Sequence, residues 1–143
     1  MLYSVDDLDL SPVPGKRYWK NGSWEWREEF IYFLMVDRFH DDHERRPVSA
    51  EGKLSGFGSA EALGRSCGGT LNGIRKHLDY IKGLGCTAIW LSPVFENNAD
   101  SYHGYAIQNY LNIDPRFGTK QDLIDLVEAA HDNQMRVFLD IVL

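Results

Sequence analysis

The sequence predicts an α/β fold built on a parallel sheet, and three observations carry that prediction. Three apolar runs rich in branched residues lie far apart in the chain, as expected of strands buried on both faces. Two helical patterns alternate with them, which gives the order β-α-β-α-β. Each helix returns to the next strand through about two to five residues, the normal range for such loops, whereas the strand-to-helix connections are far longer.

The three apolar runs predict the strands. They are FIYFLMVDRF at 30–39, TAIWLSPV at 87–94 and RVFLDIVL at 136–143. We expect strands over about 31–36, 87–92 and 136–142, parallel to one another and adjacent in chain order.

Two helices are expected between the strands. The first covers about 71–84, since an apolar stripe recurs at helical spacing and Gly85 stands at its end. The second covers about 120–132, where Thr119 and Asp122 form a capping-box pattern. The stripe of the first helix is Leu71, Ile74, Leu78, Ile81 and Leu84, and that of the second is Leu123, Leu126, Val127 and Ala130.

Composition narrows the class of protein. The chain has 143 residues, 43% of them hydrophobic, and a net charge of -6 with scattered basic residues, so no nucleic-acid footprint is supported. Cys67 and Cys86 share no metal-ligand spacing and are expected to be free thiols in a reducing compartment. No apolar run approaches the roughly 20 residues of a membrane span. The first residues show no secretion signal, so we expect no membrane partner and a cytoplasmic location.

The two long loops each follow a predicted strand and lead to the next helix, at about 37–69 and 93–118. They therefore lie at the carboxyl ends of the strands. In both barrels and open parallel sheets, the carboxyl ends of the strands hold the active site. The second loop contains SYHGYAIQNYLNIDPRFGT (101–119), which shows little helical or strand periodicity. Its Tyr102, His103 and Tyr105 could form a stacking platform and an orienting donor for a sugar. The alternative interpretation is that Tyr105 and Tyr110 pack the loop onto the barrel or sheet and that His103 hydrogen-bonds a backbone carbonyl.

Four segments in this order resemble a known family. IYFLMVDRF, GGTLNGIRKHLDYIKGLGCTAIWLSPV, YHGYAIQNYLNIDPRFGT and LIDLVEAAHDNQMRVFLDIV resemble the amino-terminal third of an α-amylase-family catalytic domain. The resemblance implies a (β/α)₈ barrel that cleaves or transfers α-glucosidic linkages with retention of configuration. Starch, glycogen or a maltooligosaccharide would be the substrate. Residues 1–29 carry no such signal and are interpreted as a lead-in or the remnant of an upstream module, with the barrel occupying 30–143.

The resemblance also implies roles for three residues. Tyr102 matches the aromatic that stacks on the sugar beside the scissile bond, and His103 matches a position near the same sugar. Asp140 matches the aspartate of the third-strand signature, which organises the site through hydrogen bonds. The resemblance suggests an arginine from a later strand as its partner, so we expect Asp140 to lack a partner in this chain. Ala106 stands where many members have tryptophan, which is a departure from the family pattern.

The catalytic carboxylates are not expected in this chain. Retaining hydrolysis needs two carboxyl groups about 5 Å apart, and the family supplies them from barrel strands four, five and seven. A barrel takes about 250 residues. We therefore expect a partial TIM (β/α)₈ barrel, with the first three β-strands and two helices joined by long βα loops and the chain ending within strand three. The fragment alone should be inactive, with its loop carboxylates (Asp37, Asp41, Asp42 and Asp100) solvated or capping.

The loop after the first predicted strand contains aspartates that could bind calcium. Some family members hold calcium in the loop after strand one, where oxygen ligands suit that ion. Here DRFHDDHERRP keeps Asp41 and Asp42 but places Arg45 and Arg46 where further ligands are needed. Two cations disfavour the ion, so no metal site is predicted, and calcium stays the alternative.

Two other functions remain open. GFGSAEALG (56–64) has part of a dinucleotide-loop pattern, but Glu61 stands at the third glycine position and no strand precedes it. A doubly wound nucleotide- or flavin-binding domain fits the element order but not the two long loops. The second alternative is a non-catalytic amylase-like barrel that serves as a sugar-binding or interaction module.

Overall fold

The computed structural model describes residues 26–42, 66–99 and 101–143. A parallel sheet of three strands forms its centre, in the order β1-β2-β5. These strands are β1 (Ile31–Leu34), β2 (Ala88–Leu91) and β5 (Arg136–Leu139). The prediction of three parallel strands adjacent in chain order is confirmed.

The strands are shorter than predicted because the chain turns away at their carboxyl ends. After β1 it enters a single helical turn, α1 (Val36–Phe39). The backbone N–H of Val36 donates to the hydroxyl of Ser92 at 3.0 Å, so the residue after β2 supports this turn instead of extending the strand. Asp140 still donates its backbone N–H to Leu91 O at 3.1 Å, and the ladder ends there.

The first predicted helix is divided into α3 (Leu71–Arg75) and α4 (Leu78–Gly83). The ring nitrogen Nδ1 of His77 lies 2.9 Å from the carbonyl oxygen of Gly73, which an unbroken helix would offer to the backbone N–H of His77. That N–H donates to Ile74 O instead. A single helix over 71–84 is therefore wrong, because a side chain takes the place of one backbone donor.

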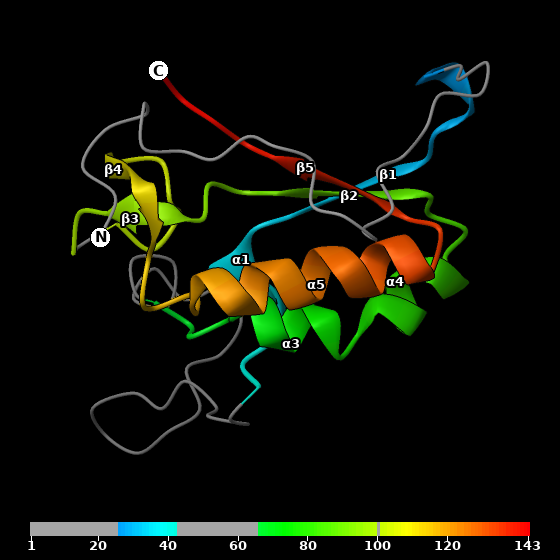
Figure 1. Ribbon diagram of the computed structural model, residues 1–143, viewed down its shortest axis with the longest axis horizontal. Coiled ribbons are helices and arrows are strands. Elements are labelled where there is room, and N and C mark those ends of the chain that lie inside the picture. The colour runs from blue at the N-terminus through cyan, green and yellow to red at the C-terminus, as the bar shows by residue number, and fades with distance from the viewer. Residues whose placement is uncertain (1–25, 43–65, 100) are drawn as a thin grey trace, which may run out of the picture.

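The second helix is confirmed as α5 (Lys120–Asp132), which begins with the predicted capping box of Thr119 and Asp122. Figure 1 shows α3, α4 and α5 together on one side of the parallel sheet. The core between them contains Leu71, Ile74, Leu78, Ile81, Ile89, Leu91, Leu126 and Ala130. Leu84, predicted to complete the first stripe, is 48% exposed.

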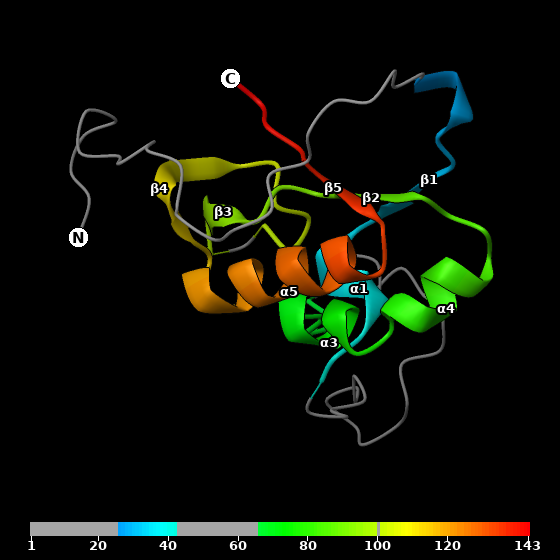
Figure 2. The same ribbon diagram turned by 45° about the vertical axis from the view of Figure 1, so that its right-hand side comes forward.

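A two-stranded antiparallel hairpin lies in the second long loop, where no strand was predicted. It consists of β3 (Phe95–Asn97) and β4 (Ile107–Ile113). In IQNYLNI, polar residues occur at both the odd and the even positions, so the apolar–polar alternation typical of a strand is absent. Two register shifts also interrupt the pairing of β3 with β4. Figure 2 shows the hairpin beside the carboxyl end of the parallel sheet.

At the opposite end of the sheet, Glu29 joins segments that are far apart in the chain. Its carboxylate accepts from the hydroxyl of Thr87 at 2.6 Å and from Nε of Arg136 at 2.9 Å. A short 3₁₀ turn (Trp26–Glu28) precedes it. Across the described residues, no helix is long and apolar enough to cross a membrane.

Candidate functional site

The carboxyl ends of the three parallel strands meet the loop of the hairpin. Arg38 follows β1, residues 101–106 belong to the loop between β3 and β4, and Asp140 follows β5 directly. Arg38 contacts Tyr102 of the loop, and Asp140 contacts Tyr105. The structure therefore brings Tyr102, His103 and Asp140 to one end of the sheet, the end at which parallel α/β folds place their sites.

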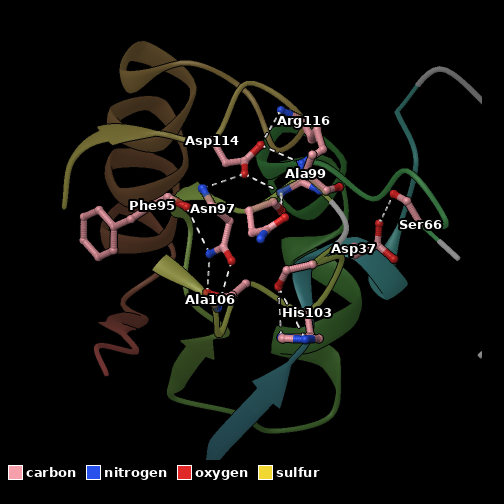
Figure 3. A network of polar contacts seen from close by, with 12 residues as sticks. Asp37, Ser66, Phe95, Asn97, Ala99, His103, Ala106, Asp114 and Arg116 are labelled. Carbon is pink, nitrogen blue, oxygen red and sulfur yellow. Dashed lines mark hydrogen bonds and ion pairs between the residues drawn. The ribbon is translucent and has the colours of Figure 1, made fainter. Parts of the chain in front are cut away.

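Asp37 is a buried carboxylate, 2% exposed, so of the two environments predicted for it, solvated or capping, the structure has the capping one. It accepts from the hydroxyl of Ser66 at 2.5 Å (Figure 3), and from the backbone N–H groups of Cys67 and Gly68. The guanidinium of Arg38 lies 3.1 Å away and also donates to the sulfur of Cys67. A carboxylate engaged in this way ties the start of one loop to its end, a capping role.

Of the other loop carboxylates, the structure gives contacts for Asp42 but does not describe Asp100. Asp42 accepts from the hydroxyl of Thr70 at 2.9 Å and from the amide of Asn72 at 2.6 Å, which joins it to the start of α3. Asp100 lies outside the described residues, as do Arg45 and Arg46. Within 26–42, 66–99 and 101–143, no group of three or more His, Cys, Asp or Glu side chains could hold a metal ion.

Tyr102 and His103 lie next to the end of β1. The guanidinium carbon of Arg38 stands 4.1 Å from the centre of the Tyr102 ring, so a cation covers one face of that ring. His103 accepts the backbone N–H of Tyr105 on Nδ1 at 2.9 Å, which puts the proton of a neutral ring on Nε2. The hydroxyl of Ser101 lies 3.3 Å from Nδ1 and 3.4 Å from Nε2.

Gly104 allows the loop to bend against β2. Its φ is +86°, and a Cβ atom there would lie 2.2 Å from the carbonyl oxygen of Pro93. No residue with a side chain fits both the conformation and the space, so glycine is required at this point.

A polar network beneath the loop fixes its path, as Figure 3 shows. The amide of Asn97 accepts from Ala106 N at 2.8 Å and donates to Gly104 O. The backbone N–H of Asn97 donates to the carboxylate of Asp114 at 3.1 Å. Arg116 binds that carboxylate at 2.7 Å, so the hairpin and the loop share one set of bonds.

Asp114 is charged in this network. Burial alone would raise its pKa, but the bonds from Arg116 and the backbone of Asn97 outweigh burial and hold the pKa below its ordinary value. Arg116 also donates to the carbonyl oxygens of Asn98 and Ala99, at 3.1 and 2.8 Å. The ion pair thus reaches the segment that leads into the loop.

Tyr105 links the loop to β5. The residue is 39% exposed; its hydroxyl donates to the carboxylate of Asp140 at 2.8 Å, and its ring stacks on His103 at 5.8 Å between centres. Burial, together with the hydrogen bond to Asp140 and the charge of that carboxylate, raises the pKa of Tyr105 to about 12. The expectation from sequence that Asp140 lacks a partner in this chain was wrong, because the partner comes from the preceding loop.

Sequence reasoning missed Asn97, Asp114 and Arg116, although one signal was present. Asp before Pro is typical of a turn. Asp114 accepts the backbone N–H of Arg116 at 2.9 Å, the bond expected of such a turn. Nothing in the sequence indicates that Asn97 lies under the loop.

The fold and the site define an α/β protein that carries an aromatic loop at the carboxyl edge of a parallel sheet, as (β/α)-barrel enzymes do. The family model "Alpha amylase, catalytic domain" matches residues 30–143. The chain belongs to the α-amylase family, whose catalytic domain is a TIM barrel.

Individual relatives agree with this assignment. Alpha-amylase 2 of Dictyoglomus thermophilum is 42% identical over 145 residues, which is 99% of this chain and 24% of that protein. The structure of the α-amylase of Geobacillus thermoleovorans complexed with acarbose is 41% identical, with a TM-score of 0.66 over 81% of this chain and 23% of that one. A cyclomaltodextrin glucanotransferase is 34% identical, with a TM-score of 0.62 over 79% of this chain and 25% of its own. The chain therefore spans about a quarter of the length of these relatives.

Proposed function

We propose that this chain is the amino-terminal part of a catalytic barrel that acts on α-glucosidic linkages, as a retaining glycoside hydrolase or a glucanotransferase. Starch, glycogen or maltooligosaccharides are the proposed substrates. The observation that carries the proposal is the meeting of Tyr102, His103 and Asp140 at one edge of the sheet, in a chain of this family. The relatives named α-amylase and cyclomaltodextrin glucanotransferase support it.

The residues at this edge suit a sugar. A pyranose ring presents C–H faces to an aromatic ring and hydroxyls to polar groups. Tyr102 has Arg38 on one face of its ring, and Tyr105 is 39% exposed as a residue, so both are candidates for the stacking contact. His103 would orient a hydroxyl, and Asp140 would act through Tyr105.

The catalytic pair is proposed to come from later strands of the barrel. Asp37 is engaged by several donors, and Asp140 accepts from Tyr105, so neither stands as an activated nucleophile or acid. Residues 1–29 are proposed as a lead-in to the barrel at 30–143, and the cytoplasmic location stays a prediction.

A chimera tests the proposal. Residues 30–143 would replace the matching segment of the Dictyoglomus thermophilum α-amylase, with the 143-residue chain alone as control. Turnover of starch or maltoheptaose by the chimera, and none by the chain alone, supports the proposal. A folded chimera that binds maltoheptaose without turnover favours the non-catalytic sugar-binding module. A folded chimera that neither binds nor turns over any α-glucan refutes both the catalytic proposal and the sugar-binding module.

A further inference from the structure

One side chain holds both ends of the turn that presents Tyr105. The carboxamide of Asn97 accepts from the backbone N–H of Ala106 at 2.8 Å and donates to the backbone carbonyl of Gly104. Tyr105 is the single residue between these two points. Asn97 is 8% exposed, so water does not substitute readily for either bond.

The remaining contacts restrict the same turn from other sides. Gly104 lies against the carbonyl oxygen of Pro93, with no room for a Cβ atom. The backbone N–H of Tyr105 donates to His103, and its hydroxyl reaches Asp140 at 2.8 Å. A rotation of the turn would therefore break the contact with Asp140 before it broke anything in the parallel sheet.

Asn97 is itself held in place. Its backbone N–H donates to Asp114, whose carboxylate is bound by Arg116, and its amide also lies 3.4 Å from the carbonyl oxygen of Phe95. A short carboxamide is the only standard side chain of this size that offers a donor and an acceptor in one plane. Aspartate would supply only the acceptor, and leucine would supply neither.

We infer that Asn97 is a positioning residue, which sets the direction of Tyr105 and so the shape of the sugar-facing surface. The inference deepens the proposed function and rests on it for what Tyr105 contacts. Asn97 does not face the substrate, and its effect on turnover passes through Tyr105.

The experiment follows the ionisation of Tyr105 in the 143-residue chain by ¹³C NMR of labelled tyrosine, with Tyr105→Phe to assign the signal. The pKa of Tyr105, raised to about 12 by burial and by Asp140, reports whether the hydroxyl keeps its place. In Asn97→Leu we expect this pKa to fall by about one unit, a tenfold easier ionisation. Asn112→Leu is the matched control, because the amide of Asn112 donates to Glu96 at 3.2 Å in the same hairpin. It should leave the Tyr105 titration unchanged.

An unchanged Tyr105 titration in folded Asn97→Leu would overturn the inference. Should that variant not fold, Asn97→Gln, which keeps the amide but displaces it by one methylene, decides by the same measurement. Unfolding of both variants beside a folded Asn112→Leu would assign Asn97 to general stability and also overturn it.

The chimera supplies a second readout. Asn97→Leu and Tyr105→Ala should each lower kcat/KM, and the double variant should lose no more than Tyr105→Ala alone, since both act through one side chain. Fully additive losses would count against the inference. A chimera without any turnover would refute the proposed function, while the titration of Tyr105 would still decide the role of Asn97.

Discussion

Removing the charge of Asp114 should destabilise the whole hairpin. The carboxylate is 2% exposed and is bound by the guanidinium of Arg116 at 2.7 Å and by the backbone N–H groups of Asn97 and Arg116. Breaking a buried ion pair costs about 3–5 kcal/mol. The Arg116 side chain is 31% exposed and can recover hydration, and asparagine keeps one acceptor oxygen. For Asp114→Asn we therefore expect a loss of about 2–3 kcal/mol in the free energy of unfolding.

The effect should depend on pH. Because the pKa of Asp114 is lowered in the folded chain, its contribution is fully present above the ordinary carboxyl pKa of about 4 and is lost as the pH falls through the folded value. The difference between the chain and Asp114→Asn should therefore be constant near neutral pH and shrink below about pH 4.

Urea unfolding followed by circular dichroism, repeated from pH 7 to pH 3, measures both quantities. Asp132→Asn, at the exposed end of α5, is the control and should change stability by less than about 0.5 kcal/mol. Equal stability of Asp114→Asn and the unchanged chain at pH 7 would refute the reasoning, as would a difference that does not respond to acid.

The remaining predictions concern the loop and its contact with β5. Tyr102→Ala in the chimera should lower kcat as well as raise KM, because a stacking contact beside the reacting sugar is partly made in the transition state; unchanged kinetics would assign Tyr102 to packing. Asp140→Asn should lower kcat more than it raises KM, and in the chain it should bring the pKa of Tyr105 down from about 12; a pKa that stays there would remove Asp140 as its cause. Gly104→Ala should destabilise the chain by at least about 1–2 kcal/mol, the cost of a left-handed conformation, in urea unfolding. Gly83→Ala, where a Cβ would meet nothing within 4 Å, is its control, and equal effects of the two would contradict the packing of the loop.

The sequence predicted the parallel sheet because each strand lies in an uninterrupted apolar run. The expected burial on both faces is not found in the described part of this chain, since the helices cover one face (Figure 1) and the paired Phe33 and Trp90 are 49% and 43% exposed. The sequence predicted α5 for a similar reason, since Thr119 and Asp122 cap it locally. The break between α3 and α4 was not predictable from the apolar stripe, because four of its five residues keep their buried positions across the break. The cause is one bond between the ring of His77 and Gly73 O, which spacing does not reveal.

The sequence predicted where the site lies on the sheet but not which hydrogen bonds hold its residues in place. The lengths of the loops placed it at the carboxyl edge, and the tyrosines drew attention to residues 101–106. The contacts that hold this loop join residues far apart in the chain, 35 positions for Tyr105 and Asp140 and 64 positions for Arg38 and Tyr102. The sequence left open whether Asp37 is solvated or capping for the same reason, since the residues that bury it lie about thirty positions later in the chain.

Two tyrosine hydroxyls of the hairpin reach the segment after β5, which has a consequence for biosynthesis. Tyr105 donates to Asp140, 35 residues later, and Tyr110 donates to the carbonyl oxygen of Val142, 32 residues later. At about 5–20 residues per second, a ribosome needs about two to seven seconds to make the intervening chain. Throughout that interval the hairpin is already synthesised but the hydroxyls of Tyr105 and Tyr110 lack these two partners, which leaves their rings open to a chaperone or to a neighbouring nascent chain. Translation speed across α5 and β5 therefore sets how long this surface waits to be covered.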